Sequence, residues 1–268
     1  MTATTSPAPP WCFPPQALLL GGNEVHVWRA TLDEPPSRIE SFLHTLAADE
    51  RTKADRFCFP RDRERFIVAR GVLRAILGRY ANRAPECVAF RYSSYGKPSL
   101  PWESGTAAIR FNVSHSRGVA LYAVTRAREV GIDLELIRGD LEVEQIAERF
   151  FSRQEISTLR ALPGHLRESA FFRCWSRKEA YIKARGKGLS LPLDQFDVSL
   201  IPGDPAALLS TRRDPDEAQR WSLQELPPVP GYAAALAVEG HGCCLACWDW
   251  RSPLGRLGSE QLLKVESR

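Results

Sequence analysis

The chain of 268 residues is long enough for one large domain or two domains of ordinary size, and either would bury a substantial core. Hydrophobic residues make up 44% and charged residues 25%, a balance that excludes a disordered or fibrous protein. The formal charge of +4 arises from 36 basic and 32 acidic residues. This excess is too small to indicate a nucleic-acid partner without a clustered basic face, but it is compatible with an anionic small ligand.

The N-terminal residues and the cysteines bear on the cellular compartment of the protein. The opening MTATTSPAPPWCFPP has no basic region followed by an apolar run of signal-peptide length, and the apolar run at 17–20 is far too short to span a bilayer. Seven cysteines are scattered without a disulfide spacing, so we expect free thiols. We therefore expect a cytoplasmic protein without a membrane partner, in which residues 1–15 form a flexible or extended arm.

The first half of the chain contains one clear helix and three strand patterns. Apolar residues recur at helical spacing over 62–80, with arginines on the remaining faces of the helix. Residues 109–113, 119–125 and 130–136 are short, β-branched or aromatic segments between polar punctuation, and we expect them to be strands of one sheet. A turn at Gly96 and Pro98 presents Lys97.

The second half adds helices and then strands. A helical block begins near Leu141, and the capping box of Ser152 and Glu155 predicts a new helix from Arg153. A longer helix covers 166–185 and stops at the glycines 186 and 188. Strand patterns near Trp221, Ala235 and Trp248 form a second sheet or extend the first. This order predicts an α+β fold whose two halves, 16–127 and 128–268, meet between Thr125 and Val130.

Four side chains in two segments suit a metal or phosphate site. Asp133 and Glu135 in VGIDLEL lie two residues apart on a strand, so their carboxylates leave the same face and can converge on one hard cation. Glu179 and Lys183 lie four residues apart on one helix face. Each pair also has an ordinary explanation, a solvated strand face for the first and a stabilising helix ion pair for the second.

Other motifs are weaker. In FNVSHS, Ser114 and His115 follow a strand directly, where a hydroxyl and an imidazole can contact an anion, although a lone histidine is usually structural. Cys244 and Cys247 form C-x-x-C, with Cys243 and His241 close by, but a second ligand pair for zinc is missing. No nucleophile elbow or P-loop occurs, which excludes those hydrolase and NTPase classes.

Taken in order, the motifs Y-G-K-P, F-N-V-S-H-S, G-I-D-L-E and F-F-x-x-W-S-x-K-E-A-Y-I-K-A-x-G-K-G-L resemble the surfactin-synthetase-activating type of 4'-phosphopantetheinyl transferase. The similarity runs from about residue 56 to about residue 198, roughly half the chain. The chain length resembles the long monomeric branch of this family, not the short trimeric one. The resemblance implies two similar α+β halves related by a pseudo-twofold axis, with coenzyme A and Mg²⁺ bound between them.

The resemblance also assigns roles to individual residues. It implies that Asp133, Glu135 and Glu179 bind Mg²⁺ and that Lys183 contacts the pyrophosphate of coenzyme A. Further contacts to coenzyme A are implied for five residues: Arg61, Arg70, Lys97, Ser114 and His115. We place His115 and Arg61 near the 3'-phosphate, and Arg70 is our own extension of that phosphate cluster along the helix.

The implied activity is the transfer of 4'-phosphopantetheine from coenzyme A to a serine of an apo acyl or peptidyl carrier protein in polyketide or nonribosomal peptide synthesis. Glu179 is the candidate general base, acting directly or through a water molecule, and Lys183 stabilises the leaving phosphate. Carrier proteins usually offer an acidic helix beside the serine, which a positive partner would favour.

Two alternatives follow from the same residues. One is a coenzyme A binding protein without transferase activity, against which the intact set of three carboxylates argues. The other is a nucleic-acid-binding module built on the arginines between 61 and 74. These arginines are spread around the helix and no nucleic-acid motif accompanies them, so we expect no nucleic-acid partner.

Overall fold

The computed structural model describes residues 8–101, 108–186 and 188–250, which form the mixed α+β fold predicted from the sequence. The α-helices are α1 (Pro36–Thr45), α2 (Ala48–Ala54), α3 (Pro60–Ala81), α4 (Val143–Phe150), α5 (Arg153–Ala161) and α6 (Gly164–Arg185). The strands are β1 (Glu24–Thr31), β2 (Arg91–Tyr92), β3 (Pro98–Ser99), β4 (Ile109–Ser116), β5 (Val119–Arg126), β6 (Val130–Leu136), β7 (Phe196–Val198), β8 (Leu208–Thr211), β9 (Trp221–Glu225), β10 (Tyr232–Glu239) and β11 (Cys244–Asp249).

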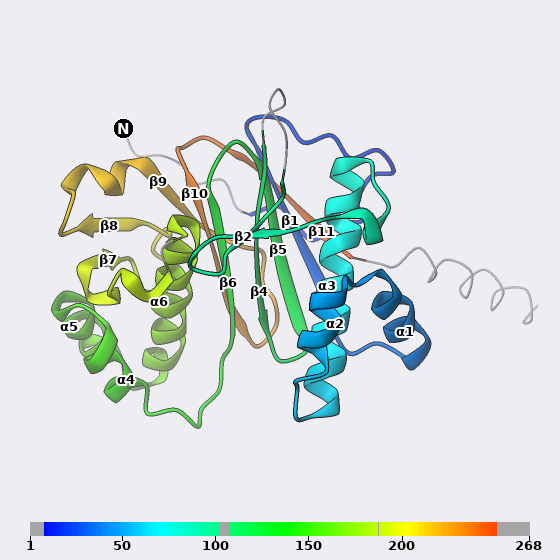
Figure 1. Cartoon of the computed structure of the whole chain (residues 1–268). Coiled ribbons are helices and arrows are strands. Elements are labelled where there is room, and N and C mark those ends of the chain that lie inside the picture. Colours follow the sequence, from blue (N-terminus) through cyan, green and yellow to red (C-terminus); the bar gives the residue numbers. More distant parts are fainter. Residues whose placement is uncertain (1–7, 102–107, 187, 251–268) are drawn as a thin grey trace, which may run out of the picture.

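Two sheets stand side by side in the centre, with helices outside each of them (Figure 1). The first sheet has the strand order β11-β1-β5-β4, and the second has the order β6-β10-β9. The small pairs β2-β3 and β7-β8 are separate. The prediction that 109–113, 119–125 and 130–136 share one sheet was therefore wrong for the third segment, because β6 pairs with β10.

Side chains replace backbone pairing where the two sheets meet. Asn112 Oδ1 accepts a hydrogen bond from the Ile132 amide at 2.9 Å. The Ser114 and Ser116 hydroxyls accept in the same way from the amides of residues 134 and 136, each at 3.2 Å. The constant offset of 20 residues means that β4 and β6 run parallel, and alternate side chains of β4 meet alternate amides of β6. We call Asn112, Ser114 and Ser116 the β4 comb.

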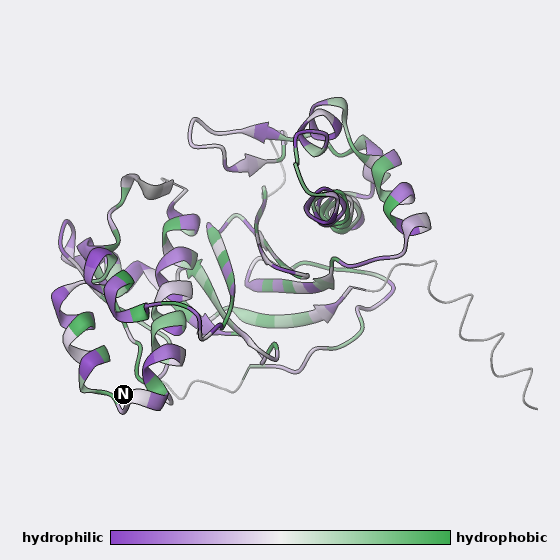
Figure 2. Cartoon of the chain, turned by 90° about the horizontal axis from the view of Figure 1, so that it is seen from below, coloured by the Kyte–Doolittle hydropathy of each residue, from purple (hydrophilic) through white to green (hydrophobic). Residues whose placement is uncertain are grey.

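Three hydrophobic clusters hold the layers together. One lies between α6 and the second sheet, and another lies between α3 and the first sheet. The third contains residues from both sheets, including Val27 and Leu121 of the first and Ile132 and Leu236 of the second. In Figure 2 hydrophobic residues recur along the central strands, as expected for sheets covered on both faces.

The predicted helices and their ends are confirmed. The helical pattern over 62–80 is α3, and that over 166–185 is α6, which ends at Gly186 in the left-handed conformation (φ 64°). Ser152 and Glu155 form the predicted capping box at the start of α5. The later strand patterns are β9, β10 and β11, of which β9 and β10 complete the second sheet and β11 joins the first.

One arginine of α3 departs from the predicted surface position. Arg74 is 2% exposed and forms a buried ion pair with Glu50 of α2 at 2.7 Å. Its guanidinium also donates to the carbonyls of Pro85 and Val88. The Glu50 carboxylate and these carbonyls stabilise the buried guanidinium. The helical periodicity alone had placed Arg74 on the solvent-facing side of α3.

The N-terminal arm is described only from residue 8, so residues 1–7 of the predicted arm lie outside the described part. Cys12 forms a parallel bridge with Trp248 of β11, and the Trp11 indole donates to the Pro228 carbonyl. These described arm residues are therefore extended along the first sheet. Within the described ranges, no helix combines the length and apolar character that crossing a membrane requires.

A glycine lets β6 approach α6 closely. A Cβ atom at Gly131 would lie 2.0 Å from the Ala180 carbonyl oxygen and 2.3 Å from the Ala184 nitrogen, both backbone atoms of α6. Backbone atoms cannot move aside as a side chain can, so the strand and the helix touch at their main chains.

We expect Gly131→Ala to lower the free energy of unfolding by about 3 kcal/mol, since the added methyl group must force β6 and α6 apart. Urea denaturation followed by circular dichroism measures this loss. Gly164→Ala is the matched control, because no atom lies within 4 Å of a Cβ there, and it should change stability by about 0.5 kcal/mol or less. Equal stability of the two variants would contradict the close contact.

Candidate active site

Strand β6 carries the predicted carboxylates into a cleft beside α6. Asp133 is 2% exposed, and its Oδ1 atom lies 2.6 Å from Lys183 Nζ and accepts a hydrogen bond from the Ser114 hydroxyl at 3.0 Å. Its Oδ2 atom is buried and has no hydrogen-bond partner among the described residues. A buried carboxylate oxygen without a partner is costly unless a cation or donor can reach it.

Helix α6 supplies the second wall of the cleft. Glu179 and Lys183 lie on one face of α6, as predicted, and Lys183 Nζ bonds both Asp133 and Ser114. Lys178, the neighbour of Glu179, is fully buried on another face, where Nζ donates to the carbonyls of Leu193 and Phe196 at 2.7 and 2.6 Å. It also pairs with Glu155 at 2.8 Å. This anchor fixes the rotation of α6 and turns Glu179 toward β6.

The pKa values of the two glutamates of the cleft are raised. The pKa of Glu179 is raised to about 7, first by burial and then by the negative charge of Asp133, with a smaller contribution from Glu135. Burial and Asp133 also raise the pKa of Glu135. Lys183 opposes both shifts. A carboxyl group with a pKa near neutrality can take and release protons at physiological pH, which suits a general base.

The three carboxylates do not form a closed metal cage. Among the described residues, no group of three or more histidine, cysteine, aspartate or glutamate side chains is close enough to hold a metal ion. The Lys183 ammonium occupies the space beside Asp133. The unpartnered Asp133 Oδ2 and the mutual repulsion of Asp133, Glu135 and Glu179 nevertheless fit a hard divalent cation that prefers oxygen ligands.

Lys97 and His115 lie near this cleft, but in different settings. Lys97 Nζ contacts Glu129 Oε2 and donates to the Ala184 carbonyl of α6, both at 3.1 Å. His115 lies within β4 and not after it, so the predicted strand end was three residues short. Although His115 is exposed, partial desolvation by the surrounding protein, followed by the positive charges of Lys183 and Lys53, lowers its pKa. Sequence reasoning missed Lys53, which lies on α2 without a recognisable motif.

Arg61 and Arg70 pair with carboxylates outside the cleft. Arg61 donates to Asp33 Oδ2 at 3.2 Å, and its side chain is 70% exposed. Arg70 forms an ion pair with Glu50, and its guanidinium lies 4.1 Å from the centre of the Phe90 ring. Both arginines are thus already paired with carboxylates.

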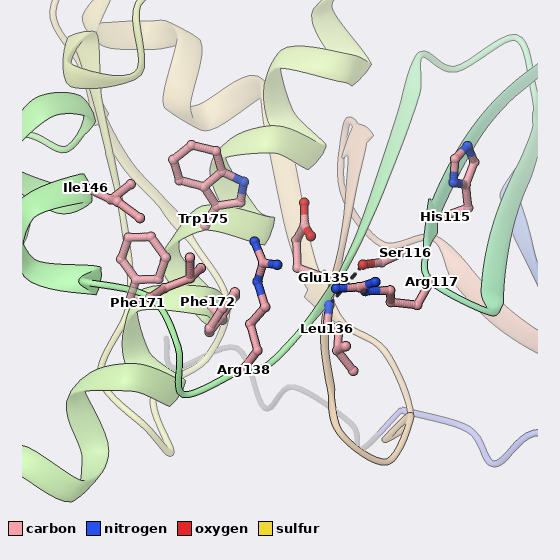
Figure 3. A pocket seen from close by; sticks show the side chains of 11 residues that line it. His115, Ser116, Arg117, Glu135, Leu136, Arg138, Ile146, Phe171, Phe172 and Trp175 are labelled. Carbon is pink, nitrogen blue, oxygen red and sulfur yellow. Dashed lines mark hydrogen bonds between the residues drawn. The ribbon is translucent and has the colours of Figure 1, made fainter. Parts of the chain in front are cut away.

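A cavity of about 460 Å³ opens beside Glu135 (Figure 3). Its apolar wall comes mainly from helices α4 and α6 and includes Ile146, Phe171 and Trp175. Arg117 and Arg138 add positive charge to the lining. Sequence reasoning missed both arginines. Arg117 has a φ of 53° because it is the first residue of the two-residue turn between β4 and β5, and such tight turns require a positive φ.

The cysteines near the C-x-x-C motif, Cys243, Cys244 and Cys247, show no features of a metal or redox site. All seven cysteines are free thiols, as predicted. Cys243 accepts a hydrogen bond from the Gln224 side chain, and burial raises the pKa of Cys247 to about 12. A thiol with a raised pKa is a poor nucleophile and a poor metal ligand at neutral pH.

The known proteins and family profiles that match this chain are phosphopantetheinyl transferases. Residues 129–237 match the profile of the 4'-phosphopantetheinyl transferase superfamily, and residues 28–126 match that of the 4'-phosphopantetheinyl transferase N-terminal region. The chain is 42% identical to the 4'-phosphopantetheinyl transferase HetI of Nostoc sp. over 90% of this chain and 98% of the relative. It is 30% identical to the 4'-phosphopantetheinyl transferase Sfp of Bacillus subtilis over 87% and 97%, respectively. A mouse relative, the L-aminoadipate-semialdehyde dehydrogenase-phosphopantetheinyl transferase, is 28% identical over 76% and 71%.

We expect Glu179→Gln to raise the free energy of unfolding of the metal-free protein by about 1–2 kcal/mol at pH 8. The folded state holds the Glu179 proton up to about pH 7, whereas an unfolded glutamate releases it near its ordinary value of 4.5. The ionised side chain therefore destabilises the fold increasingly as pH rises from 4.5 through 7, and fully above it.

Urea denaturation in the presence of a chelator, at pH 5 and pH 8, measures this effect. The gain should be small at pH 5, where the wild-type side chain is still protonated in the folded state. Glu168→Gln, on the same helix, serves as the control and should show no such pH dependence. A gain that is equal at both pH values would contradict the raised pKa.

Proposed function

The chain belongs to the 4'-phosphopantetheinyl transferase superfamily, and we propose that it transfers 4'-phosphopantetheine from coenzyme A to a serine of an apo carrier protein, releasing adenosine 3',5'-bisphosphate. The observation that carries this proposal is the convergence of Asp133 and Glu135 on β6 with Glu179 and Lys183 on α6. The intact set of Asp133, Glu135 and Glu179 argues against a coenzyme A binding protein that has lost transferase activity. We accordingly favour the transferase over the binding protein.

We propose Mg²⁺ as the cofactor, with Asp133, Glu135 and Glu179 as its protein ligands. The unpartnered Asp133 Oδ2 supports this assignment, as does the oxygen-only donor set. When bound, Mg²⁺ would screen the negative charge of the pyrophosphate. In the metal-free cleft, Lys183 partly supplies the missing positive charge, and we infer that Lys183 turns to the phosphate when the cation is present.

The reaction needs a proton acceptor and a stabiliser of the leaving group. The serine oxygen attacks the β-phosphorus of coenzyme A, and the bond between that phosphorus and the oxygen of adenosine 3',5'-bisphosphate breaks. Glu179 accepts the serine proton directly or through a water molecule, and the route through water is favoured because a carboxylate that holds the cation loses basicity. Lys183 neutralises charge on the departing phosphate.

For coenzyme A itself we propose contacts from Lys97, Ser114 and His115, with Lys53 as an additional phosphate contact because its charge reaches His115. Arg61 and Arg70 can join them only by exchanging Asp33 and Glu50 for phosphate. In the metal-free cleft the Ser114 hydroxyl donates a hydrogen bond to Asp133. A contact between Ser114 and coenzyme A would have to use this same hydroxyl.

The carrier protein is proposed to approach the cavity of Figure 3. Apolar side chains of α6 beside Arg117 and Arg138 complement an acidic helix with apolar residues, which is the surface that carrier proteins of polyketide or nonribosomal peptide synthesis usually offer next to the serine. Electrostatic attraction at this rim would raise the association rate more than the affinity.

We also propose that 16–127 and 128–268 are two similar halves related by a pseudo-twofold axis, with residues 1–15 as an arm. Each half sets one 22-residue helix, α3 or α6, against its own sheet. The two family profiles meet between residues 126 and 129, which supports the same division. Strand β11 crosses back to pair with β1, so the last strand of the second half completes the sheet of the first.

The working state is proposed to be a monomer in the cytoplasm, with neither a nucleic-acid nor a membrane partner. The four central residues of the cleft come from one chain, so no second copy is needed to complete it. Seven free thiols suit a reducing compartment. The Arg61 and Arg70 side chains, which would belong to a nucleic-acid face, are occupied by carboxylates.

The transfer is tested by intact-mass spectrometry of apo carrier proteins incubated with this chain, coenzyme A and Mg²⁺, with a chelator control. The wild-type chain should add one phosphopantetheine arm only when Mg²⁺ is present. Glu179→Gln should lower the rate by about 100-fold or more because the proton acceptor is lost. Lys183→Ala should both weaken coenzyme A binding and slow turnover. Glu168→Gln, on the same helix but outside the cleft, should behave as the wild type.

An active, Mg²⁺-dependent Glu179→Gln enzyme would overturn the role of Glu179. Coenzyme A binding without transfer to any carrier would instead favour a binding protein without transferase activity. Calorimetric titration of coenzyme A into the same preparations shows whether a chain that does not transfer the arm still binds coenzyme A.

A further inference from the structure

The turn between β2 and β3 carries Lys97 across to the second sheet and α6. The turn is closed within itself, because the Ser93 hydroxyl accepts a hydrogen bond from the Lys97 amide at 3.1 Å and the Ser93 carbonyl accepts one from the Gly96 amide at 2.9 Å. Figure 1 shows this hairpin reaching from the side of α3 toward α6. There Lys97 Nζ contacts Glu129, directly before β6, and the Ala184 carbonyl of α6. Lys97 thus links the hairpin to the strand and the helix that carry the cleft residues.

Glu129 is held through both its main chain and its side chain. Its carbonyl accepts a hydrogen bond from the Glu239 amide of β10 at 3.0 Å, which fixes its backbone at the start of β6. Its Oε2 atom lies 3.1 Å from Lys97 Nζ, and its Oε1 atom lies 3.4 Å from Arg110 Nε of β4. One carboxylate therefore stands between two cations, and the three side chains together keep an excess of one positive charge, which favours an anion.

The Lys97 ammonium has a donor to spare. A lysine carries three N–H donors and no acceptor. Two of them serve the Glu129 carboxylate and the Ala184 carbonyl, each at 3.1 Å. This carbonyl belongs to the last turn of α6, where backbone acceptors lack helical partners and a positive charge is favourable. Within the described ranges Nζ bonds no third acceptor, so one proton remains for a ligand while both anchors stay in place.

We propose that Glu129 is a positioning residue for Lys97, holding the ammonium against the end of α6 so that its third proton meets a phosphate oxygen of coenzyme A. This inference rests on the proposed function, in which Lys97 contacts coenzyme A. Glu129 is itself negative and does not touch the phosphate, so it acts through the lysine. Arg61 and Arg70 differ from Lys97, because each must leave a carboxylate before it can bind phosphate.

Glu129 has two opposing effects on an anionic ligand. Its hydrogen bond orders a long, flexible side chain before coenzyme A arrives, and this advance ordering removes part of the entropy cost of binding. Its negative charge repels the same phosphates. Replacement by glutamine removes the charge but keeps an oxygen to which Lys97 can donate, whereas replacement by alanine removes both. The difference between these two variants therefore measures the positioning alone.

The experiment is calorimetric titration of coenzyme A, in the presence of Mg²⁺, into the full-length wild type, Glu129→Gln and Glu129→Ala. Glu129→Gln should bind coenzyme A at least as tightly as the wild type does, and Glu129→Ala should bind it roughly fivefold more weakly than Glu129→Gln. Glu144→Ala is the matched control, because Glu144 forms a similarly exposed ion pair with Arg167 near the start of α6 and not at its end. This control should match the wild type.

Two further measurements identify the route of the effect. In a Lys97→Ala background, Glu129→Gln and Glu129→Ala should bind coenzyme A equally, because no ammonium is left to hold. In steady-state transfer to a carrier protein, Glu129→Ala should raise the KM for coenzyme A and leave kcat and the KM for the carrier unchanged. A merely structural glutamate would not confine its effect to one substrate.

Equal affinity of Glu129→Gln and Glu129→Ala for coenzyme A, with the wild type binding it, would overturn this inference alone. A difference between the two that persists in the Lys97→Ala background would also overturn it, since the effect would then pass through another contact such as Arg110. Absence of coenzyme A binding by the wild-type chain would overturn the proposed function and this inference with it.

Discussion

The junction between β4 and β6 is the contact on which the rest of this molecule depends. Two strands that run parallel would ordinarily share backbone hydrogen bonds, but here the side chains of Asn112, Ser114 and Ser116 stand between them. As a result β4 and β6 are each an edge strand of their own sheet. The two sheets meet through these side chains and do not merge into one.

The chemistry of the cleft follows from burying charge beside that junction. Asp133, Glu135 and Glu179 share a poorly solvated space with one ammonium, and their repulsion raises the proton affinity of Glu135 and Glu179. The structure therefore holds a destabilising arrangement that the proposed divalent cation would relieve. Other buried charges contact a charge of opposite sign, as Lys178 does with Glu155 and Arg74 does with Glu50. The unmatched set stands out against this background and marks the functional site.

Local sequence signals predicted local structure well. Periodicity gave α3 and α6, the capping box gave the start of α5, and the ordered motifs gave the carboxylates and Lys183. Strand β1 and helices α1 and α2 carried no comparable signal and were not predicted. The sheet membership of β6 could not be read from its residues, because pairing with β10 is decided by segments about 100 positions apart in the chain.

The site residues missed from the sequence share a physical reason. Lys53, Ser116, Arg117 and Arg138 have polar side chains of common types, and only the tertiary arrangement brings them near His115 or Glu135. Arg61 and Arg70 show the converse, since a helix rich in arginine suggested phosphate contacts, while Asp33 and Glu50 from other segments pair with them. Charge on one segment has no defined partner until the neighbouring segments are in place.

The main-chain contact at Gly131 limits how this site can change. Interfaces between side chains can be reshaped by compensating substitutions, but a strand and a helix that touch at backbone atoms have no side chain to exchange. The distance between the carboxylates of β6 and Glu179 on α6 is therefore insulated from substitutions in the surrounding core. If the proposed metal site is correct, a descendant of this chain with a preference for a larger or smaller cation would have to alter the length of a ligand side chain, by exchanging aspartate and glutamate, while the scaffold kept its dimensions.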